Sequence, residues 1–363
     1  MSNHTPQINK FFKWCMGIIF ILIIIYLCTL VDFLFIPITS LIGVVLLPLM
    51  LSVFFYYLLR PLVDLLERHK LNRSLAIILI YIAIAVILAL FIVCVWPSMH
   101  NQMINLVDNA PSLFSTLGNK IHELEQNGAL SAIFPGDVNP LTTITEYLNK
   151  GFLLVTDYVA GLFGLVSKVT ITLFTFPLIL FYMLKEGEKF SRKLVSFAPK
   201  RFLIAANEAL DDIDSALSSF IIGRVLINLA LGVLMYLGFI LIGLPYALLL
   251  TVVAVIMNFI PFIGAILSSI PIVIIGFTQS PSVAIWSLVV ILLSQQIQDN
   301  IISPYVFGKQ LDVHPLTVII LVLIGGDLAG ITGILLAIPY YLIIKVIVSK
   351  VYLLFYREKW EHL

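Results

Sequence analysis

Two long apolar stretches in the last third of the chain, residues 246–277 and 316–348, are each interrupted near the middle. The first is broken at residues 258–264 and the second at residues 325–333, and the polar run 295–300 lies between them. Backbone that leaves helical geometry inside a bilayer must be buried in protein or line a wet cavity, because lipid offers its N–H and C=O groups no partner. The interruptions therefore predict a transport pathway.

The composition indicates the class of protein. Hydrophobic residues make up 61% and charged residues 11% of the chain, and its mean hydropathy is +1.09, whereas about a quarter of the residues of an average soluble domain are charged. We therefore expect an all-α polytopic integral membrane protein in contact with the lipid bilayer. The net charge of +1 does not favour a nucleic-acid partner, and three cysteines without CxxC or CxxH spacing indicate no metal site and no cofactor.

Uninterrupted apolar stretches of about 20 residues can span a bilayer, and the chain offers about six full transmembrane helices on this criterion. They are residues 16–35, 41–59, 75–96, 165–184, 225–242 and 283–302. The first follows two lysines, but it is longer than the core of a usual signal peptide and no cleavage site follows it. We expect a retained transmembrane helix there.

Lysine and arginine residues gather before the first of these spans, between the second and third, after the fourth and at the end of the chain. By the positive-inside rule these groups are cytoplasmic, which predicts cytoplasmic N- and C-termini. Residues 98–164 carry few basic residues and an amphipathic pattern, so we expect outward-facing helices there. A second amphipathic pattern, over residues 202–220, predicts a cytoplasmic helix.

In this orientation each interrupted stretch begins and ends on one side of the membrane, so we expect two re-entrant helical hairpins that enter from opposite sides. Residues 262–271 resemble residues 331–339, which indicates a weak inverted repeat with the solute site where the broken helices meet. The alternative is that both hairpins span fully, giving about eight to ten transmembrane helices. The expected regions are residues 1–97, 98–164, 165–222, a transport core at 223–348, and a tail at 349–363.

Several motifs follow one another in the last third: residues 258–264 (NFIPFIG), 295–304 (QQIQDNIISP), 314–316 (HPL), 325–333 (GGDLAGITG) and 338–339 (IP). Together they resemble the signature of the autoinducer-2 exporter family, in particular of its PerM-like permeases. The resemblance implies a secondary transporter of the bacterial inner membrane that assembles as a homo-oligomer. It further implies export of a small polar solute, such as the quorum-sensing signal autoinducer-2, or else sodium(lithium)/proton antiport.

One position departs from the family pattern. Members often carry an acidic residue two places before the asparagine of the QxxxNxxxP stretch, and this chain has Gln298 there, with Asp299 next to it. One residue along a helix rotates a side chain by about 100°. Asp299 therefore does not simply replace the missing carboxylate.

Polar residues within the apolar segments are the candidates for transport. Intramembrane carboxylates are costly and usually functional, so Asp299 and Asp327 are the predicted coupling residues for protons or monovalent cations; the alternative for Asp327 is to cap a half-helix. Side chains predicted to bind the solute are Asn258, Gln295, Gln298, Asn300 and Arg224. The alternatives are hydrogen bonds between helices for the amides and a place at the cytoplasmic interface for Arg224.

Glycine and proline residues are predicted to break the helices and to free backbone groups at the site. They are Pro261, Gly264, Pro271, Pro304, Gly325, Gly326, Gly330, Gly333 and Pro339.

No motif of a metalloprotease, serine hydrolase or nucleotide-binding enzyme is present in the sequence, so we expect no catalytic residue and no enzyme. A solute exporter predicts a site rich in amide side chains, whereas a cation/proton antiporter predicts an essential pair of carboxylates. A membrane scaffold without transport activity would instead engage a partner through its outer segment.

Overall fold

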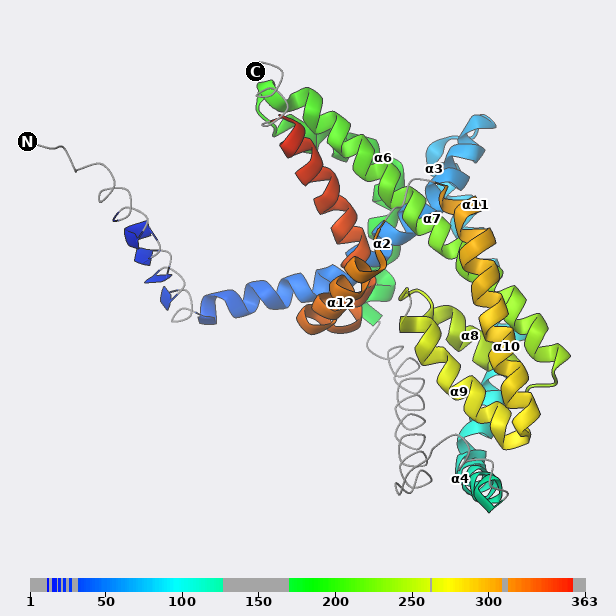
Figure 1. The fold of residues 1–363 in the computed structure, drawn as a ribbon. Helices are drawn as coiled ribbons and strands as arrows, with labels where there is room; N and C mark the ends of the chain where they lie inside the picture. Colours follow the sequence, from blue (N-terminus) through cyan, green and yellow to red (C-terminus); the bar gives the residue numbers. More distant parts are fainter. Residues whose placement is uncertain are drawn as a thin grey trace, which may run out of the picture.

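The computed structural model describes residues 32–126, 170–261, 263–308 and 313–354, with short stretches between residues 12 and 27. These residues form helices and the turns that join them (Figure 1). In chain order the helices are α2 (Asp32–Arg68), α3 (Arg73–Leu90), a π-helical segment (Phe91–Val95), α4 (Trp96–Gln126), α6 (Thr170–Ser196), a 3₁₀ turn (Lys200–Phe202), α7 (Leu203–Leu241), α8 (Ala247–Met257), α9 (Ile263–Gln279), α10 (Pro281–Ile297), a second π-helical segment (Gln298–Ile302), α11 (Ser303–Phe307) and α12 (Pro315–Tyr352). The described residues contain no strand, which confirms the all-α prediction.

Five helices in the described part of the chain are long and apolar enough to cross a membrane: Val45–Arg68, Arg73–Asn109, Lys200–Leu241, Pro281–Phe307 and Thr332–Tyr352. Three shorter apolar helices accompany them: Ala247–Met257, Ile263–Gln279 and Pro315–Gly330. This set of helices confirms the prediction of a polytopic membrane protein. The short ones fall on the two interrupted stretches of the sequence.

The boundaries of the spans differ from the predicted ones. Helix α2 is described from Asp32 and runs without a break through the predicted second span, while the first predicted span is described only in part, with gaps between residues 18 and 31. Helix α6 begins at Thr170, so only part of the predicted fourth span is described. The amphipathic pattern at 202–220 and the predicted fifth span form one helix, α7, because nothing between them ends a helix.

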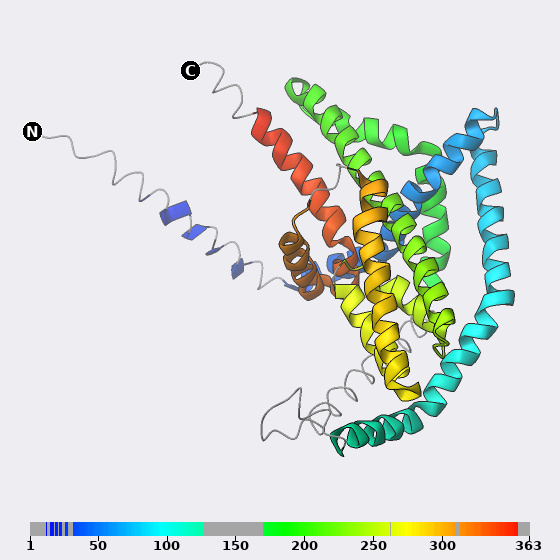
Figure 2. The ribbon, with the colours of Figure 1, turned by 45° about the vertical axis from the view of Figure 1, so that its right-hand side comes forward.

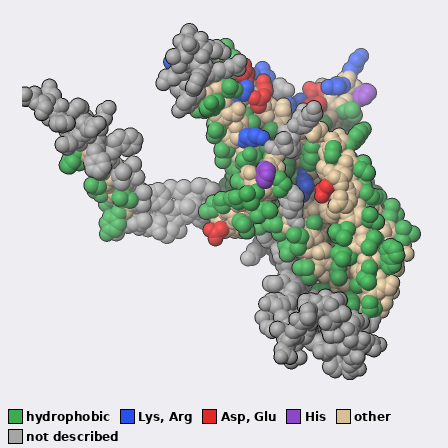
Figure 3. Space-filling view, in the orientation of Figure 1, with side chains coloured by type: hydrophobic (Ala, Val, Ile, Leu, Met, Phe, Trp, Pro, Cys, Tyr) green, Lys and Arg blue, Asp and Glu red, His purple; other side chains and the backbone are tan. Residues whose placement is uncertain are grey.

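Apolar side chains cover much of the surface, as a lipid-facing surface requires. Large hydrophobic residues on α3, α7 and α10 are more than half exposed, among them Ile87, Leu229 and Leu293. Figure 3 shows hydrophobic side chains along the flank of the molecule and charged side chains gathered at its upper end. We call that upper end, where α2 and α6 end and α3 begins, the basic end.

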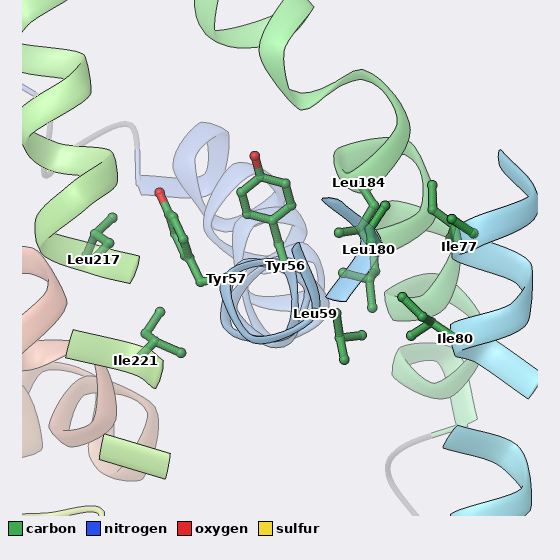
Figure 4. Close-up of a cluster of buried hydrophobic side chains, with 11 residues drawn as sticks. Tyr56, Tyr57, Leu59, Ile77, Ile80, Leu180, Leu184, Leu217 and Ile221 are labelled. Carbon is green, nitrogen blue, oxygen red and sulfur yellow. The ribbon is translucent and has the colours of Figure 1, made fainter. Parts of the chain in front are cut away.

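A hydrophobic core at the basic end joins α3, α6 and α7 to α2 (Figure 4). Tyr57 lies on the side of α2 that faces Leu217 and Ile221 of α7, whereas Leu59 lies on the side that faces α6 and α3. All these side chains are buried. Helix α2 is therefore the central element of this core.

Ion pairs at the basic end connect the start of α7 to two other helices. Arg60 of α2 contacts Asp214 at 2.7 Å. Lys350 near the end of α12 contacts Glu208 at 3.0 Å and Asp212 at 2.9 Å. The acidic stretch 208–214 of α7 thus holds one basic residue from α2 and one from α12.

Helices α3 and α4 form one curved rod through the π-helical segment between them, which runs along the edge of the molecule (Figure 2). The rod ends beneath α8 and α9, where Leu106 packs against the core of these helices. The side chain of Gln102 accepts a hydrogen bond from the backbone N–H of Leu249 at 3.1 Å. Because Tyr246 gives α8 no side-chain cap, a neighbouring helix satisfies one of the free N–H groups of its first turn.

Helices α8 and α9 form the first hairpin. Helix α8 has 11 residues and rises about 16 Å, roughly half of the hydrocarbon thickness of ~30 Å. The chain turns at residues 258–261, and α9 runs back alongside α8, burying Ile272 and Ile275 against Leu250 and Ala254. A single residue, Ser280, connects α9 to the next helix, α10. Its hydroxyl caps α10 by accepting a hydrogen bond from the N–H of Val283 at 3.1 Å. Both ends of this hairpin therefore lie at the end opposite to the basic end.

Helix α12 forms the second hairpin, because its backbone leaves helical geometry at Ala329 (φ −143°) and Gly330 (φ 58°). Only glycine readily adopts the conformation of residue 330, with φ positive and ψ −140°. The first half, Pro315–Gly330, is capped by His314, whose Nδ1 accepts from the N–H of Leu316 at 3.2 Å. The two halves fold back on each other, since Val318 and Val322 share a buried cluster with Ile338 and Leu342.

The two hairpins close by the same contact between a glycine and a backbone carbonyl. A Cβ atom at Gly264, in the first turn of α9, would collide with the carbonyl of Met257 at the end of α8. A Cβ atom at Gly333, just after the kink of α12, would collide with the carbonyl of Gly325. The sequence resemblance between residues 262–271 and 331–339 thus corresponds to the same close contact between a glycine and a carbonyl in both hairpins.

We expect Gly264→Ala and Gly333→Ala each to lower the free energy of unfolding by about 1–3 kcal/mol, because a methyl group has no space beside a fixed carbonyl. Gly118→Ala is the matched control, since a Cβ atom at this helical position meets nothing within 4 Å, and it should be neutral or mildly stabilising. Thermal unfolding of the three purified variants measures this. Equal melting temperatures would contradict the close contacts.

We also expect R60E to destabilise the protein, because it places a carboxylate beside Asp214 and Asp64. The double variant R60E/D214R should recover most of the loss, roughly 1 kcal/mol, since it restores an opposite pair between α2 and α7. A double-mutant cycle on melting temperatures measures the coupling. Additive effects of the two single changes would show that the pair contributes nothing.

Candidate functional site

The polar cluster lies where the tip of the first hairpin meets α7 and the end of α10. Arg224, Asn228 and Gly232 are spaced four residues apart on α7, so they share one face of that helix. A Cβ atom at Gly232 would contact the side chains of Val255 and Thr251 of α8. This face of α7 therefore points at the first hairpin.

Asn258 is the centre of the cluster. It is 2% exposed, and its Nδ2 donates to Oδ1 of Asn228 at 3.1 Å and to Oε1 of Gln298 at 2.9 Å. Its backbone carbonyl, left free because α8 ends here, accepts a hydrogen bond from Nη2 of Arg224. Asn258, at the tip of the first hairpin, thus joins α7 to the second π-helical segment, which follows α10.

Gln298 opens the second π-helical segment, Gln298–Ile302, which precedes Pro304. Gln298 is 4% exposed, and its Nε2 donates to Oδ1 of Asp299 at 3.2 Å. Gln298 therefore takes the position that faces Asn258, while the side chain of Asp299 is exposed and reaches the cluster only through Gln298. This agrees with the expectation that Asp299 does not simply replace a carboxylate at position 298.

Three buried polar atoms of the site have no hydrogen-bond partner among the described residues: Nε of Arg224, Nδ2 of Asn228 and Oγ1 of Thr251. Arg224 also makes no ion pair with a carboxylate of the described residues. Buried polar groups are normally paired. The cluster is thus short of hydrogen-bond acceptors.

The structure does not bring the other predicted residues into this cluster. Asp327 is exposed within the first half of α12 and bonds no other described residue. Asn300 is exposed and donates to Oε1 of Gln296 at 2.7 Å on its own helix. The side chain of Gln295 makes no hydrogen bond to another described residue, although its backbone carbonyl accepts from the N–H of Gln298. Arg224 lies within the continuous helix α7 and not in a connecting segment before the predicted fifth span.

The glycine and proline positions fall into two groups. Pro261 lies in the turn of the first hairpin, Gly264 and Gly333 make the close contacts described above, and Gly330 is the kink of α12. Gly325 is the partner of Gly333 in that close contact, since a Cβ atom there would collide with the carbonyl of Gly333. The remaining residues lie within helices that continue through them: Pro271 in α9, Pro304 in α11, and Gly326 and Pro339 in α12.

Asn228 belongs to the site, and Thr251 lies about two turns before Asn258 on α8, although the sequence analysis singled out neither. Asn228 is 1% exposed and lies within the apolar segment 225–242, four residues after Arg224. A buried amide inside a span and one helical turn from an arginine was the signal available for it. Thr251 carried no comparable signal, because threonine is common in membrane helices. Among the described residues no group of three His, Cys, Asp or Glu side chains could hold a metal ion.

Comparison with known proteins agrees with this architecture. The model of the AI-2E family transporter matches residues 18–353. The chain is 33% identical over 341 residues to "Putative transport protein YueF" of Bacillus subtilis, covering 93% of this chain and 92% of that protein. It is 27% identical to "Putative transport protein YrrI" of the same organism, over 96% and 97% of the two chains, and 28% identical to "Putative permease PerM" of Escherichia coli K12, over 83% and 86%. The chain belongs to the AI-2E transporter family.

Proposed function

We propose that this protein is a secondary transporter of the bacterial inner membrane that exports a small polar solute, a signal such as autoinducer-2, as a homo-oligomer. The observation that carries the proposal is the buried cluster of Asn228, Asn258 and Gln298 at the tip of a helical hairpin. Amide side chains offer a polar solute both donors and acceptors within an apolar protein. In this proposal the basic end faces the cytoplasm.

Transport in this scheme depends on movement of the first hairpin. Its tip is held by the two side-chain hydrogen bonds of Asn258, by Arg224 on its carbonyl, and by Ile260 packed against α12. Withdrawal of the tip frees these polar groups for the solute, and its return covers them again. The site opens to one side at a time if the second hairpin controls access from the basic end.

Antiport is the less favoured function. It requires a pair of essential carboxylates, and Asp299 and Asp327 do not meet in the described structure. Asp299 is the better candidate for proton coupling in either case, because Gln298 connects it to Asn258.

We expect Asn258→Leu to reduce accumulation of autoinducer-2 in everted membrane vesicles by at least about tenfold, because it removes two hydrogen bonds and leaves two buried oxygens unpaired. Asn300→Leu is the matched control and should keep transport, since Asn300 is exposed and bonds only to its own helix. Size-exclusion profiles and membrane insertion of both variants must match the native protein. Equal accumulation in the two variants would remove the amide cluster from the pathway.

We expect Asp299→Asn to slow solute accumulation and Asp327→Asn to leave it unchanged. Internal pH should not respond to Na⁺, Li⁺ or K⁺ in vesicles that contain the native protein. Flux assays and a pH-sensitive dye in the same vesicles measure both. A cation-dependent pH change that Asp299→Asn abolishes would replace solute export by antiport, and no flux of any kind would favour a scaffold.

A further inference from the structure

The unpaired atoms of the polar cluster have one chemical character. Nε of Arg224 and Nδ2 of Asn228 are hydrogen-bond donors only, and the hydroxyl of Thr251 can donate as well. The oxygens Oδ1 of Asn228 and Oε1 of Gln298 already accept from Asn258. The unpaired buried nitrogen atoms, on Arg224 and Asn228, are therefore donors, whereas the acceptors without a bonded donor among the described residues of the cluster are Oδ1 of Asn258, at the hairpin tip, and the hydroxyl of Thr251.

The orientation of the amides follows from the carboxylate at one end of the chain of hydrogen bonds. An ionised Asp299 can only accept, so Gln298 must turn its Nε2 toward Asp299 and its Oε1 toward Asn258. Asn258 then donates to Oδ1 of Asn228, which leaves Nδ2 of Asn228 as the free end. The donor at Asn228 is thus a consequence of the whole network.

The guanidinium of Arg224, next to Asn258, uses only one of the two donors on one of its edges. Nε and Nη2 lie on one edge of the planar guanidinium, an edge that matches the two oxygens of a carboxylate or phosphate. Here Nη2 binds the neutral carbonyl of Asn258 and Nε binds nothing. A charged group in this setting is normally paired with an opposite charge.

We propose that the Nε–Nη2 edge of Arg224, together with Nδ2 of Asn228, binds an oxyanion group of the transported solute, a carboxylate or a phosphate. This inference rests on the proposed export of a small polar solute and takes that solute to be an anion in place of autoinducer-2, which carries neither a carboxylate nor a phosphate. The carbonyl of Asn258 occupies part of the site while the hairpin tip is in place, and the oxyanion replaces it when the tip withdraws. The positive charge of Arg224 disfavours a metal cation at the same place.

Binding of soluble oxyanions to the full-length protein in a phosphate-free maltoside detergent tests the inference. Sodium phosphate and sodium acetate, each compared with sodium chloride at constant ionic strength, should raise the melting temperature saturably. Arg224→Gln should weaken this binding at least about tenfold. Arg73→Gln is the matched control and should keep it, because Arg73 already pairs with Glu67 at 2.8 Å and Asp64 at 3.4 Å.

Two further variants give the sign of the effect. Asn228→Asp replaces the free donor by an acceptor and should abolish oxyanion binding, whereas Asn228→Leu removes the donor without adding a charge and should weaken binding less. If Arg224→Gln does not fold, hydrogen exchange of the native protein decides the matter. Phosphate should then change exchange in residues 220–232 and 254–261 and leave residues 80–90 unchanged.

Equal shifts in the native protein and Arg224→Gln, or no shift with either oxyanion, would overturn the inference. A shift produced only by added phosphatidylglycerol and not by the soluble anions would assign Arg224 to a lipid headgroup and overturn it as well. The binding assay involves no flux. Flux of a solute without oxyanion binding would therefore refute this inference alone, and oxyanion binding without flux would refute the proposed transport function alone.

Discussion

The backbone groups at the two ends of the short helix α8 need hydrogen-bond partners from other helices. Much of the structure around the site provides these partners. A helix of 11 residues that ends within apolar surroundings leaves backbone groups without partners at both ends. Gln102 of α4 accepts from the first turn, and Arg224 of α7 donates to the carbonyl at the other end. The short helix is thus held by side chains from two long helices, and one of these bonds lies in the polar cluster.

The two hairpins use different means to turn the chain within the protein. The first has a short loop with Pro261 and ends in a polar residue, Asn258, whereas the second is a single kink at Ala329 and Gly330 in an otherwise continuous helix. Their common element is a glycine that allows a backbone carbonyl to approach closely. Polar contacts gather at the first tip, so the two hairpins do not contribute equally to the site.

The sequence predicted much of the fold, because helix interrupters within apolar segments have few structural explanations. The break before Gly264 and the kink at Gly330 fall inside the predicted interruptions. The continuity of α7 was missed, since a change from an amphipathic to an apolar pattern resembles a boundary although no residue ends the helix. The helical conformation of residues 32–40 was missed for a similar reason, as they contain a proline and polar residues that a helix can accommodate.

The site was predicted less completely than the fold. Asn258, Gln298 and Arg224 meet, because their places on the hairpin tip, the π-helical segment and α7 are at one depth of the bundle. Asp327 does not join them, since its position depends on the direction in which α12 folds back, and spacing along the chain does not specify this. The contact between Asn228 and Asn258 likewise could not be predicted from spacing along the chain. Which face of a helix meets a neighbour is a property of tertiary packing.

The bond between Gln102 and α8 has a mechanical consequence. It fixes the base of the short helix to the curved rod of α3 and α4 (Figure 2), so α8 can act as a lever that pivots at its anchored end. A rotation of about 10° about that end displaces the tip by about 3 Å over a helix of 11 residues. A displacement of this size breaks hydrogen bonds of ordinary length, so a small tilt of one short helix is enough to release every polar contact at the tip.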